Sequence, residues 1–345
     1  MKIVVVGSKG TLGSELAKRW NDPRVAARIA ANTGVEPSVA DSVPDTIIPL
    51  NIPDFDLCSR MIAVETICDF RPDVIVNAAG INHIDWLESR PNTARTLHEH
   101  GPANLREAAR RCNALFVQYG CGEVFYRSRL AEGAVDERER CATPEEARSS
   151  VLAFDDEASL DLPVDPAAPG FDETTVPNPA SVYAKTKLES ERVASECPKS
   201  LILRFSSLFG ETSEYSSGNL VDSLLKAFCR ASRVSAISDC VLEPLWAVDV
   251  LCATKVLVRL KARGVYHLTG GSRTTPEELA RYLLAKTGLR GKSVGGVSMK
   301  EYGVSAPRSV FTILDSIRCD KLEGAYRIPD WRTAIDDFFD WRQPF

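Results

Sequence analysis

KIVVVGSKGTLG, residues 2–13, joins a short apolar run to three closely spaced glycines. The apolar run predicts a buried strand, and an amphipathic helix is expected to follow through residue 20. Glycines at this spacing permit a tight turn, bring backbone N–H groups close to a pyrophosphate and aim a helix N-terminus at its negative charge. Because the turn directly follows a strand, it favours dinucleotide binding over a purely structural turn. The residues expected at the cofactor here are Gly7, Lys9, Gly10, Thr11, Leu12 and Gly13.

Strand-like and helix-like segments then alternate along the chain with short connections. Strands are expected at 2–6, 28–32, 46–50, 73–76, 114–119 and 201–204, and helices at 55–70 and 93–111. This alternation predicts an α/β fold with a doubly wound parallel sheet of the Rossmann type. Ligands of such sheets bind at the carboxyl ends of the strands, where small residues let the backbone come close. Cofactor contacts are therefore also expected at Asn77, Ala78, Ala79 and Gly80.

The form of the nicotinamide cofactor depends on the residue at the end of the second strand. An acidic residue there would hold a ribose 2′-hydroxyl, but none is evident. Asn32 takes that place, and Lys9 precedes the second glycine of the turn. These residues favour NADP, with NAD as the alternative. Asn51 and Ile52, which come directly after the expected strand at 46–50, are added to the cofactor-binding set.

Composition limits the kinds of partner. The 345 residues carry a net charge of −5 and no long basic run, which argues against a general nucleic-acid-binding role. No apolar run approaches the roughly 18 residues of a membrane-spanning helix. Ten cysteines are scattered singly, without the spacing of a metal site. We therefore expect a cytoplasmic protein that binds small molecules, without a metal ion and without contact to a membrane.

A tyrosine and a lysine lie four residues apart in SVYAKTK, residues 181–187. On a helix this spacing places Tyr183 and Lys187 on one face. An ammonium group beside a phenol lowers the phenol's pKa from its ordinary value of about 10, so that the tyrosine exchanges a proton near neutral pH. Taken alone, the pair could also arise by chance in any helix-rich chain.

Together, these motifs resemble the extended short-chain dehydrogenase/reductases, and among them the RmlD-like dTDP-4-dehydrorhamnose reductases. The resemblance extends over nearly the whole chain and includes 178–179, 203–206, 248–250, 266–270, 307–308 and 329–331. It implies NADPH-dependent reduction of a 4-keto group on a nucleotide-linked deoxysugar, and a homodimer. It further implies that Tyr183 donates the proton, that Lys187 lowers its pKa and holds the ribose, and that Arg204 belongs to the cofactor-binding set.

Two positions depart from the reductase pattern. The family's serine or threonine falls on Cys121, and a thiol is a weak hydrogen-bond partner. Losing a good donor at such a site can cost about 3 kcal/mol of barrier. Glu123 stands where the reductases carry a tyrosine and the related 4,6-dehydratases carry a catalytic glutamate, although the aspartate that precedes this glutamate is Gly122 here.

These departures leave two alternatives beside the reductase. One is a nucleotide-sugar dehydratase or epimerase that uses Glu123. The other is a non-catalytic, NADP-binding regulatory subunit, as in the methionine adenosyltransferase beta subunit.

The resemblance also suggests two parts. Residues 1–204 are expected to form the cofactor domain, with an acidic insertion at 127–173 and a return of the chain near 243–270, and 205–345 a smaller α/β substrate-binding portion. Ser207 occupies the place of a tryptophan that packs on the sugar in the reductases. Arginine side chains bind the oxygens of a diphosphate well. The candidates for this role are Arg230 and Arg308, and also Lys226 and Arg273.

Overall fold

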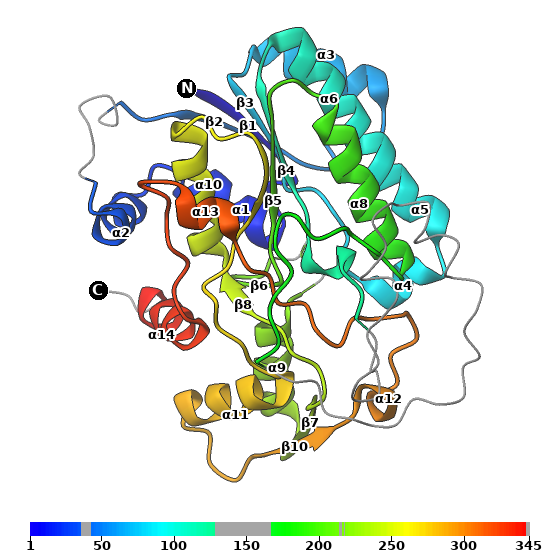
Figure 1. Ribbon diagram of the computed structural model, residues 1–345, viewed down its shortest axis with the longest axis vertical. Helices are drawn as coiled ribbons and strands as arrows, with labels where there is room; N and C mark the ends of the chain where they lie inside the picture. The colour runs from blue at the N-terminus through cyan, green and yellow to red at the C-terminus, as the bar shows by residue number, and fades with distance from the viewer. Residues whose placement is uncertain (36–42, 128–166, 214–215, 217, 343–345) are drawn as a thin grey trace.

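A six-stranded parallel sheet forms the centre of the computed structural model, which describes residues 1–35, 43–127, 167–213, 216 and 218–342 (Figure 1). Its strands stand in the order β2–β1–β3–β4–β5–β9. Their bounds are β1 (Lys2–Val6), β2 (Thr46–Leu50), β3 (Val74–Asn77), β4 (Leu115–Tyr119), β5 (Ser200–Arg204) and β9 (Gly264–His267). The predicted Rossmann-type sheet is confirmed.

Alternation along the strands gives the sheet two buried faces. Val4, Ile75 and Phe116 point to one face, and Val5 and Val117 to the other, as the two-residue period of a strand requires. The first face is covered by α3 (Arg60–Phe70), α6 (Gly101–Cys112) and α8 (Val182–Ser195), and the second by α1 (Thr11–Arg19), α2 (Pro23–Thr33) and α10 (Ala247–Arg259) (Figure 1). Short helices α4 (Ile84–Glu88), α5 (Pro91–Arg95), η2 (Thr96–His100) and η3 (Gly122–Val124) complete this part.

Outside the main sheet lie two small parallel pairs of strands. They are β6 (Ser207–Phe209) with β8 (Pro244–Trp246), and β7 (Arg233–Ile237) with β10 (Ser293–Val297). The helices of this portion are α9 (Leu220–Arg230), α11 (Pro276–Thr287), α12 (Met299–Tyr302), α13 (Ile317–Lys321) and α14 (Trp331–Trp341). In Figure 1, α9, α11, β7 and β10 gather below the carboxyl ends of β4 and β5. The division of the chain at residue 204 stays a prediction, and 128–166 of the expected insertion lie outside the described residues.

Several predicted elements differ from the structure. The strand expected at 28–32 is wrong, because this stretch lies within α2. Asp22 accepts a hydrogen bond from the Arg24 N–H and Pro23 opens the first turn, so this stretch carries the N-terminal signals of a helix. The helix expected at 55–70 begins only at Arg60, and that at 93–111 is divided among α5, η2 and α6.

A buried ion pair joins the sheet to α8. The Arg204 guanidinium, at the end of β5, donates from Nε and Nη2 to one Glu191 carboxylate oxygen at 2.9 and 2.7 Å. The two side chains are 7% and 3% exposed. Charges buried so deeply stabilise a fold only while both partners are present.

We therefore predict that Arg204→Met lowers the free energy of unfolding by about 3–5 kcal/mol, because it leaves the Glu191 carboxylate buried without a cation. The double variant Arg204→Met/Glu191→Leu should recover much of that loss. Arg281→Met is the matched control, since Arg281 pairs with Glu277 while 58% exposed, and should cost less than about 1 kcal/mol. Denaturant unfolding measures all three. Equal losses for the two single variants would contradict the prediction.

Candidate active site

A cleft of about 420 Å³ opens at the carboxyl ends of β1, β3 and β4. From β1 the chain continues to β2 on one side of β1, and then crosses to β3 on the other side. The cleft lies at this crossover, which is the usual ligand site of such sheets. The sequence-predicted residues that line it are Gly10, Thr11, Leu12, Asn77, Ala78, Ala79, Gly80, Cys121, Glu123, Tyr183, Lys187, Ser207 and Arg308. The structure thus brings together most of the residues predicted to act on cofactor or substrate.

The glycine turn shapes the floor of this cleft. Gly7 has φ +80, and a Cβ there would stand 2.5 Å from the backbone nitrogen of Ala79. A Cβ on Gly13 would stand 2.0 Å from the Gly7 carbonyl oxygen. Only glycine allows these backbones to approach so closely. Helix α1 begins just beyond Gly10, which gives it no side-chain cap, so its first N–H groups are available to an anion. These features fit a dinucleotide pyrophosphate.

Tyr183 and Lys187 lie one turn apart near the start of α8. The Ser181 hydroxyl caps this helix by accepting from the Ala184 N–H at 3.1 Å. The Lys187 ammonium is buried and donates to the carbonyl oxygen of Tyr119, the last residue of β4, at 2.6 Å. This bond holds the helix at the sheet edge where the cleft opens.

The pKa of Tyr183 differs from the sequence prediction. Burial raises it well above 10, and the Cys121 thiol and the Glu123 carboxyl act in the same direction. The predicted lowering of this pKa by Lys187 is therefore wrong for the protein on its own, because burial dominates and Cys121 and Glu123 add to it. Burial in turn lowers the pKa of Lys187, against the effect of Cys121 and Glu191. Tyr183 thus keeps its proton at neutral pH.

Cys121 and Glu123 follow β4 and face the same cleft. Burial raises the pKa of the Cys121 thiol to about 12, so it stays protonated. Burial also raises the pKa of Glu123 to about 7, although the Arg308 guanidinium and the Ser309 N–H oppose the shift. A carboxyl group with this pKa can both give and take a proton near neutral pH.

Arg308 reaches the cleft from the C-terminal part of the chain. Its guanidinium pairs with Asp85 on α4, whose carboxylate also accepts from the N–H groups of Ser305 and Ala306. These donors hold the pKa of Asp85 at about 2 against the effect of burial. Asp85 therefore fastens the 305–308 segment over the site.

His98 is a site residue that sequence reasoning missed. Its Nε2 accepts from the Ile81 N–H at 3.3 Å, so Nδ1 carries the proton and donates to the Thr186 hydroxyl at 3.0 Å. That hydroxyl donates in turn to the Tyr183 carbonyl oxygen. Burial, helped by Lys187, lowers the pKa of His98 to about 3, so the ring is neutral. The chain of bonds links the 78–81 turn to α8.

Three predicted site residues lie elsewhere. Asn32 is on α2, where its side chain exchanges hydrogen bonds with the Arg327 backbone, so it cannot read the ribose. Arg204 is buried against Glu191 and does not line the cleft. Arg230 is exposed at the end of α9, away from the cleft lining. The first difference follows from the misplaced strand. Arg204 is predicted from the family resemblance and Arg230 from its charge, and neither criterion takes burial or position in the fold into account.

Three further predicted residues, Lys9, Asn51 and Ile52, lie beside the glycine turn. Two others, Lys226 and Arg273, do not line the cleft. Lys9 donates to the Ile52 carbonyl oxygen at 3.4 Å, and Asn51 to the same oxygen at 3.3 Å, which places them at the carboxyl end of β2 beside the glycine turn. Lys226 pairs with Asp222 on the surface of α9, and the Arg273 guanidinium donates to the Ala168 carbonyl oxygen.

The cleft wall also contains residues that no motif indicated, among them Asn219, Cys240, Leu242, Pro276, Met299, Ser309 and Thr312. They come from loops and short elements after β5 and meet only in the folded chain. Thr312 and Ser206 share a hydrogen bond of 2.8 Å between their hydroxyls. A pattern within one segment could not have identified them.

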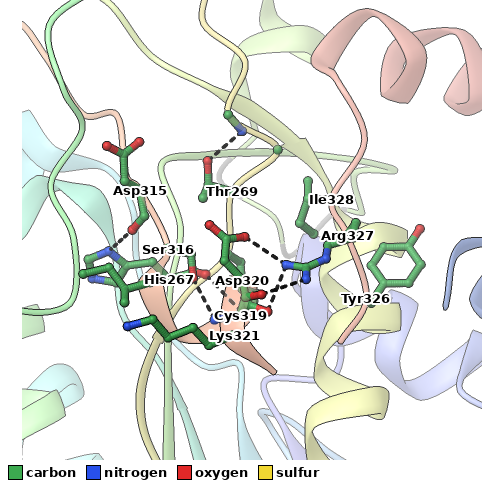
Figure 2. A pocket seen from close by; sticks show the side chains of 14 residues that line it. His267, Thr269, Asp315, Ser316, Cys319, Asp320, Lys321, Tyr326, Arg327 and Ile328 are labelled. Carbon is green, nitrogen blue, oxygen red and sulfur yellow. Dashed lines mark hydrogen bonds and ion pairs between the residues drawn. The ribbon is translucent and has the colours of Figure 1, made fainter. Parts of the chain in front are cut away.

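A second cavity, of about 650 Å³, lies at the end of β9 and shares no lining residue with the cleft. Figure 2 shows Arg327 reaching Asp320 on one side of the view, with Lys321, Asp315 and His267 on the other side. His267 is fully buried, and burial beside Arg204 lowers its pKa to about 4. Within the described residues, no group of three or more His, Cys, Asp or Glu side chains could hold a metal ion, and no helix could cross a membrane.

The His98 bonds predict a difference between two variants. His98→Gln can still accept from the Ile81 N–H, whereas His98→Asn can reach only Thr186. We expect the Ile81 amide to exchange with solvent deuterium about fivefold faster in the Asn variant, which corresponds to the loss of one hydrogen bond of about 1 kcal/mol. Hydrogen exchange read by mass spectrometry measures this. Equal protection in both variants would show that His98 does not hold the turn.

The Glu123 carboxyl predicts a pH-dependent stability. The pKa of Glu123 is higher in the folded protein than in the unfolded chain. The stability that this carboxyl contributes is therefore fully present below about pH 4.5 and is lost as pH rises through about 7. Glu123→Gln does not titrate and should gain stability over the wild type across that window. Because the Glu123 side chain is only half-buried, we expect this gain in the free energy of unfolding to be about 2 kcal/mol. Unfolding curves between pH 5 and 8 check this, and a constant difference would contradict it.

Comparison with known proteins gives one family. The family model of the RmlD substrate binding domain matches residues 1–139 and 149–343. A dTDP-4-dehydrorhamnose reductase of Aggregatibacter actinomycetemcomitans is 23% identical over 352 residues, which cover 97% of each chain. A methionine adenosyltransferase 2 subunit beta of Danio rerio is 27% identical over 343 residues, 97% of this chain and 89% of that protein.

Solved structures show the same fold. A dTDP-4-dehydrorhamnose reductase of Clostridium acetobutylicum superposes with TM-score 0.76 at 21% identity, over 100% of both chains. That of Bacillus anthracis, in complex with NADP, gives 0.76 at 19%, over 99% of both. A dTDP-glucose 4,6-dehydratase of Streptomyces venezuelae, with NAD and TYD bound, gives 0.68 at 16%, over 99% of this chain and 96% of that one. With the family model matched along nearly its whole length, the chain belongs to the RmlD substrate binding domain family.

Proposed function

We propose that this protein uses NADPH to reduce a 4-keto group on a nucleotide-linked deoxysugar. The observation that carries the proposal is the meeting of the glycine turn, Tyr183 and Lys187 in one cleft at the carboxyl edge of a parallel sheet. The family and the reductase named among its relatives support the same reaction. NADPH supplies the hydride that the keto carbon receives.

The chain offers a fitting cradle for that cofactor. The first turn of α1, beyond Gly10, would take the pyrophosphate, and the 77–80 turn would lie along the dinucleotide. Since β2 ends at Leu50, Asn51 rather than an acid would stand at the ribose position, with Lys9 beside it. An uncharged amide near a lysine accommodates a 2′-phosphate without repulsion, which favours NADP over NAD.

Tyr183 would donate the proton that completes the alcohol. Reduction creates negative charge on the former keto oxygen, and a phenol that is still protonated can neutralise it. The Lys187 ammonium, fixed on the Tyr119 carbonyl oxygen, would hold the ribose and favour the phenolate as it forms. Cys121 would occupy the position that polarises the substrate carbonyl, but its thiol is a weak hydrogen-bond donor. Tyr183 would therefore supply more of the stabilisation of the keto oxygen.

The substrate would enter from the side of β6 and the 305–312 segment. Ser207 leaves space where the resembling reductases carry a tryptophan, and Arg308 offers a cation for the diphosphate. Its Nε is buried and lacks a hydrogen-bond partner among the described residues. Of the four cations predicted to bind the diphosphate, Arg308 is the one that lines the cleft.

Glu123 supports a second candidate, dehydration or epimerisation of the sugar with the cofactor unchanged overall. A carboxyl whose pKa lies near 7 could take and return a proton in the same cleft as Tyr183. The third candidate, a non-catalytic regulatory subunit, is favoured by Cys121 and by the similarity to a methionine adenosyltransferase subunit. Both differ from the reductase in leaving NADPH unoxidised.

The deciding assay follows NADPH oxidation with dTDP-4-keto-6-deoxysugars and weighs the products. We expect products heavier by two hydrogens, one NADPH consumed per product, and a loss of about 10²–10⁴-fold in kcat for Tyr183→Phe with NADPH affinity retained. Sugars changed without NADPH oxidation would favour the dehydratase or epimerase. NADPH bound but neither cofactor nor sugar altered would favour the regulatory subunit.

A hydroxyl at position 121 tests whether a stronger hydrogen-bond donor at this place increases the reductase activity. Cys121→Thr places a stronger donor beside Tyr183, and we expect kcat to rise by up to about 10²-fold, equivalent to about 3 kcal/mol of barrier. Cys240→Ser, a control on another buried thiol of the cleft wall, should not raise it. A fall in kcat for Cys121→Thr would mean that the thiol has a role of its own.

Two broader features also remain proposals. The homodimer rests on the family resemblance, and the cytoplasmic location rests on the composition and on cysteines that are scattered singly along the chain. Nine cysteines of the described part are free thiols, which suits a reducing compartment.

A further inference from the structure

Two cysteine thiols face each other between helices α3 and α6, which run side by side over one face of the sheet (Figure 1). The Cys112 Sγ lies 3.4 Å from the Cys68 Sγ. Both side chains are half-buried, so small reagents can reach them. Neither residue lines the cleft or the second cavity. The pair therefore has no part in the proposed reduction.

The two helices can bring these sulfurs into bonding distance. A disulfide has an S–S length of about 2.05 Å, so the atoms must approach by roughly 1.4 Å. Both residues lie in the last turn of their helices: Arg71 and Asn113, with φ of 48° and 55°, end α3 and α6. Side-chain rotation and a small shift of these ends suffice, because no hydrogen bond in the helix interior needs to break.

We propose that Cys68 and Cys112 are a redox modification site that closes to a disulfide when the protein meets a low-molecular-weight disulfide of the glutathione class. The bond joins α3 to α6. Since α6 also packs against α8, the cross-link strengthens the support of the helix that carries Tyr183 and Lys187. The proposal does not depend on the reductase function.

The chemistry is two successive thiol–disulfide exchanges. One cysteine thiolate attacks a sulfur of the small disulfide, forms a mixed disulfide and releases one small thiolate. The second cysteine thiolate then attacks the protein sulfur of that mixed disulfide and releases the other. The small disulfide gains two electrons and the two protons that the cysteines lose, and it leaves as two thiols. Burial and the neighbouring thiol raise the pKa of Cys112 to about 11, so closure is slow at neutral pH and is best measured at equilibrium.

Cys58 provides a matched control. It is also half-buried, but its Sγ lies 3.6 Å from the carbonyl oxygen of Thr96, the first residue of η2. A small disulfide can add to it but should not close onto a second protein sulfur. Cys112→Ser leaves Cys68 without its partner and should trap the mixed disulfide there.

The full-length chain is equilibrated with reduced and oxidised glutathione at several ratios, quenched with acid, alkylated and digested without reduction. We expect wild type and Cys58→Ser to yield a peptide that links residues 68 and 112, with the loss of two hydrogens per chain. We also expect a rise of several degrees in melting temperature, because the cross-link restricts the unfolded chain. Cys112→Ser should instead carry glutathione on Cys68. Mixed disulfides on both cysteines of the wild type, or two unmodified thiols at the most oxidising ratio, would overturn the proposal.

Discussion

The hydrogen bond from the Lys187 ammonium to the Tyr119 carbonyl oxygen fixes the geometry on which the active site depends. Parallel strands bring their carboxyl ends to one edge of the sheet, but this edge alone does not position a helix over it. The buried lysine makes that connection between β4 and α8. Below it, Glu191 on the same helix binds Arg204 of β5, so α8 is tied to two neighbouring strands by charged groups. Tyr183 is thereby held in the wall of the cleft that the glycine turn also lines.

The environment of the cleft favours groups that keep their protons. Burial raises the pKa of Tyr183 and of Cys121, and raises that of Glu123 to about 7. A site with protonated donors suits the neutralisation of an oxygen that becomes negative during reduction. His98, which burial keeps neutral, and Asp85, which its donors keep charged, hold the surrounding turn and the 305–308 segment. Each ionisable group at the cleft thus has an environment that suits a distinct role.

Local signals in the sequence were sufficient for the first strand, the glycine turn and the Tyr183–Lys187 pair, because each is contained within one segment. Asn32 lies on α2, because the apolar residues that suggest a strand follow Asp22 and Pro23, which begin a helix. The family resemblance predicts Arg204 at the cofactor, but its guanidinium pairs with the buried Glu191 carboxylate inside the protein. His98 and Thr312 could not be found, because they reach the cleft only through contacts between distant segments. Cys121 and Glu123 were located, yet their protonation depends on burial that only the fold reveals.

Transfer of deuterium tests most directly whether this cleft passes a hydride from the cofactor to the sugar. The enzyme would be supplied with NADPH deuterated at C4 of the nicotinamide, on each face in turn, and with a dTDP-4-keto-6-deoxysugar. The account predicts that one of the two cofactors yields a sugar with deuterium at C4, found by NMR, and that Tyr183→Phe greatly slows its formation. A sugar product that contains no deuterium from either cofactor would contradict the account.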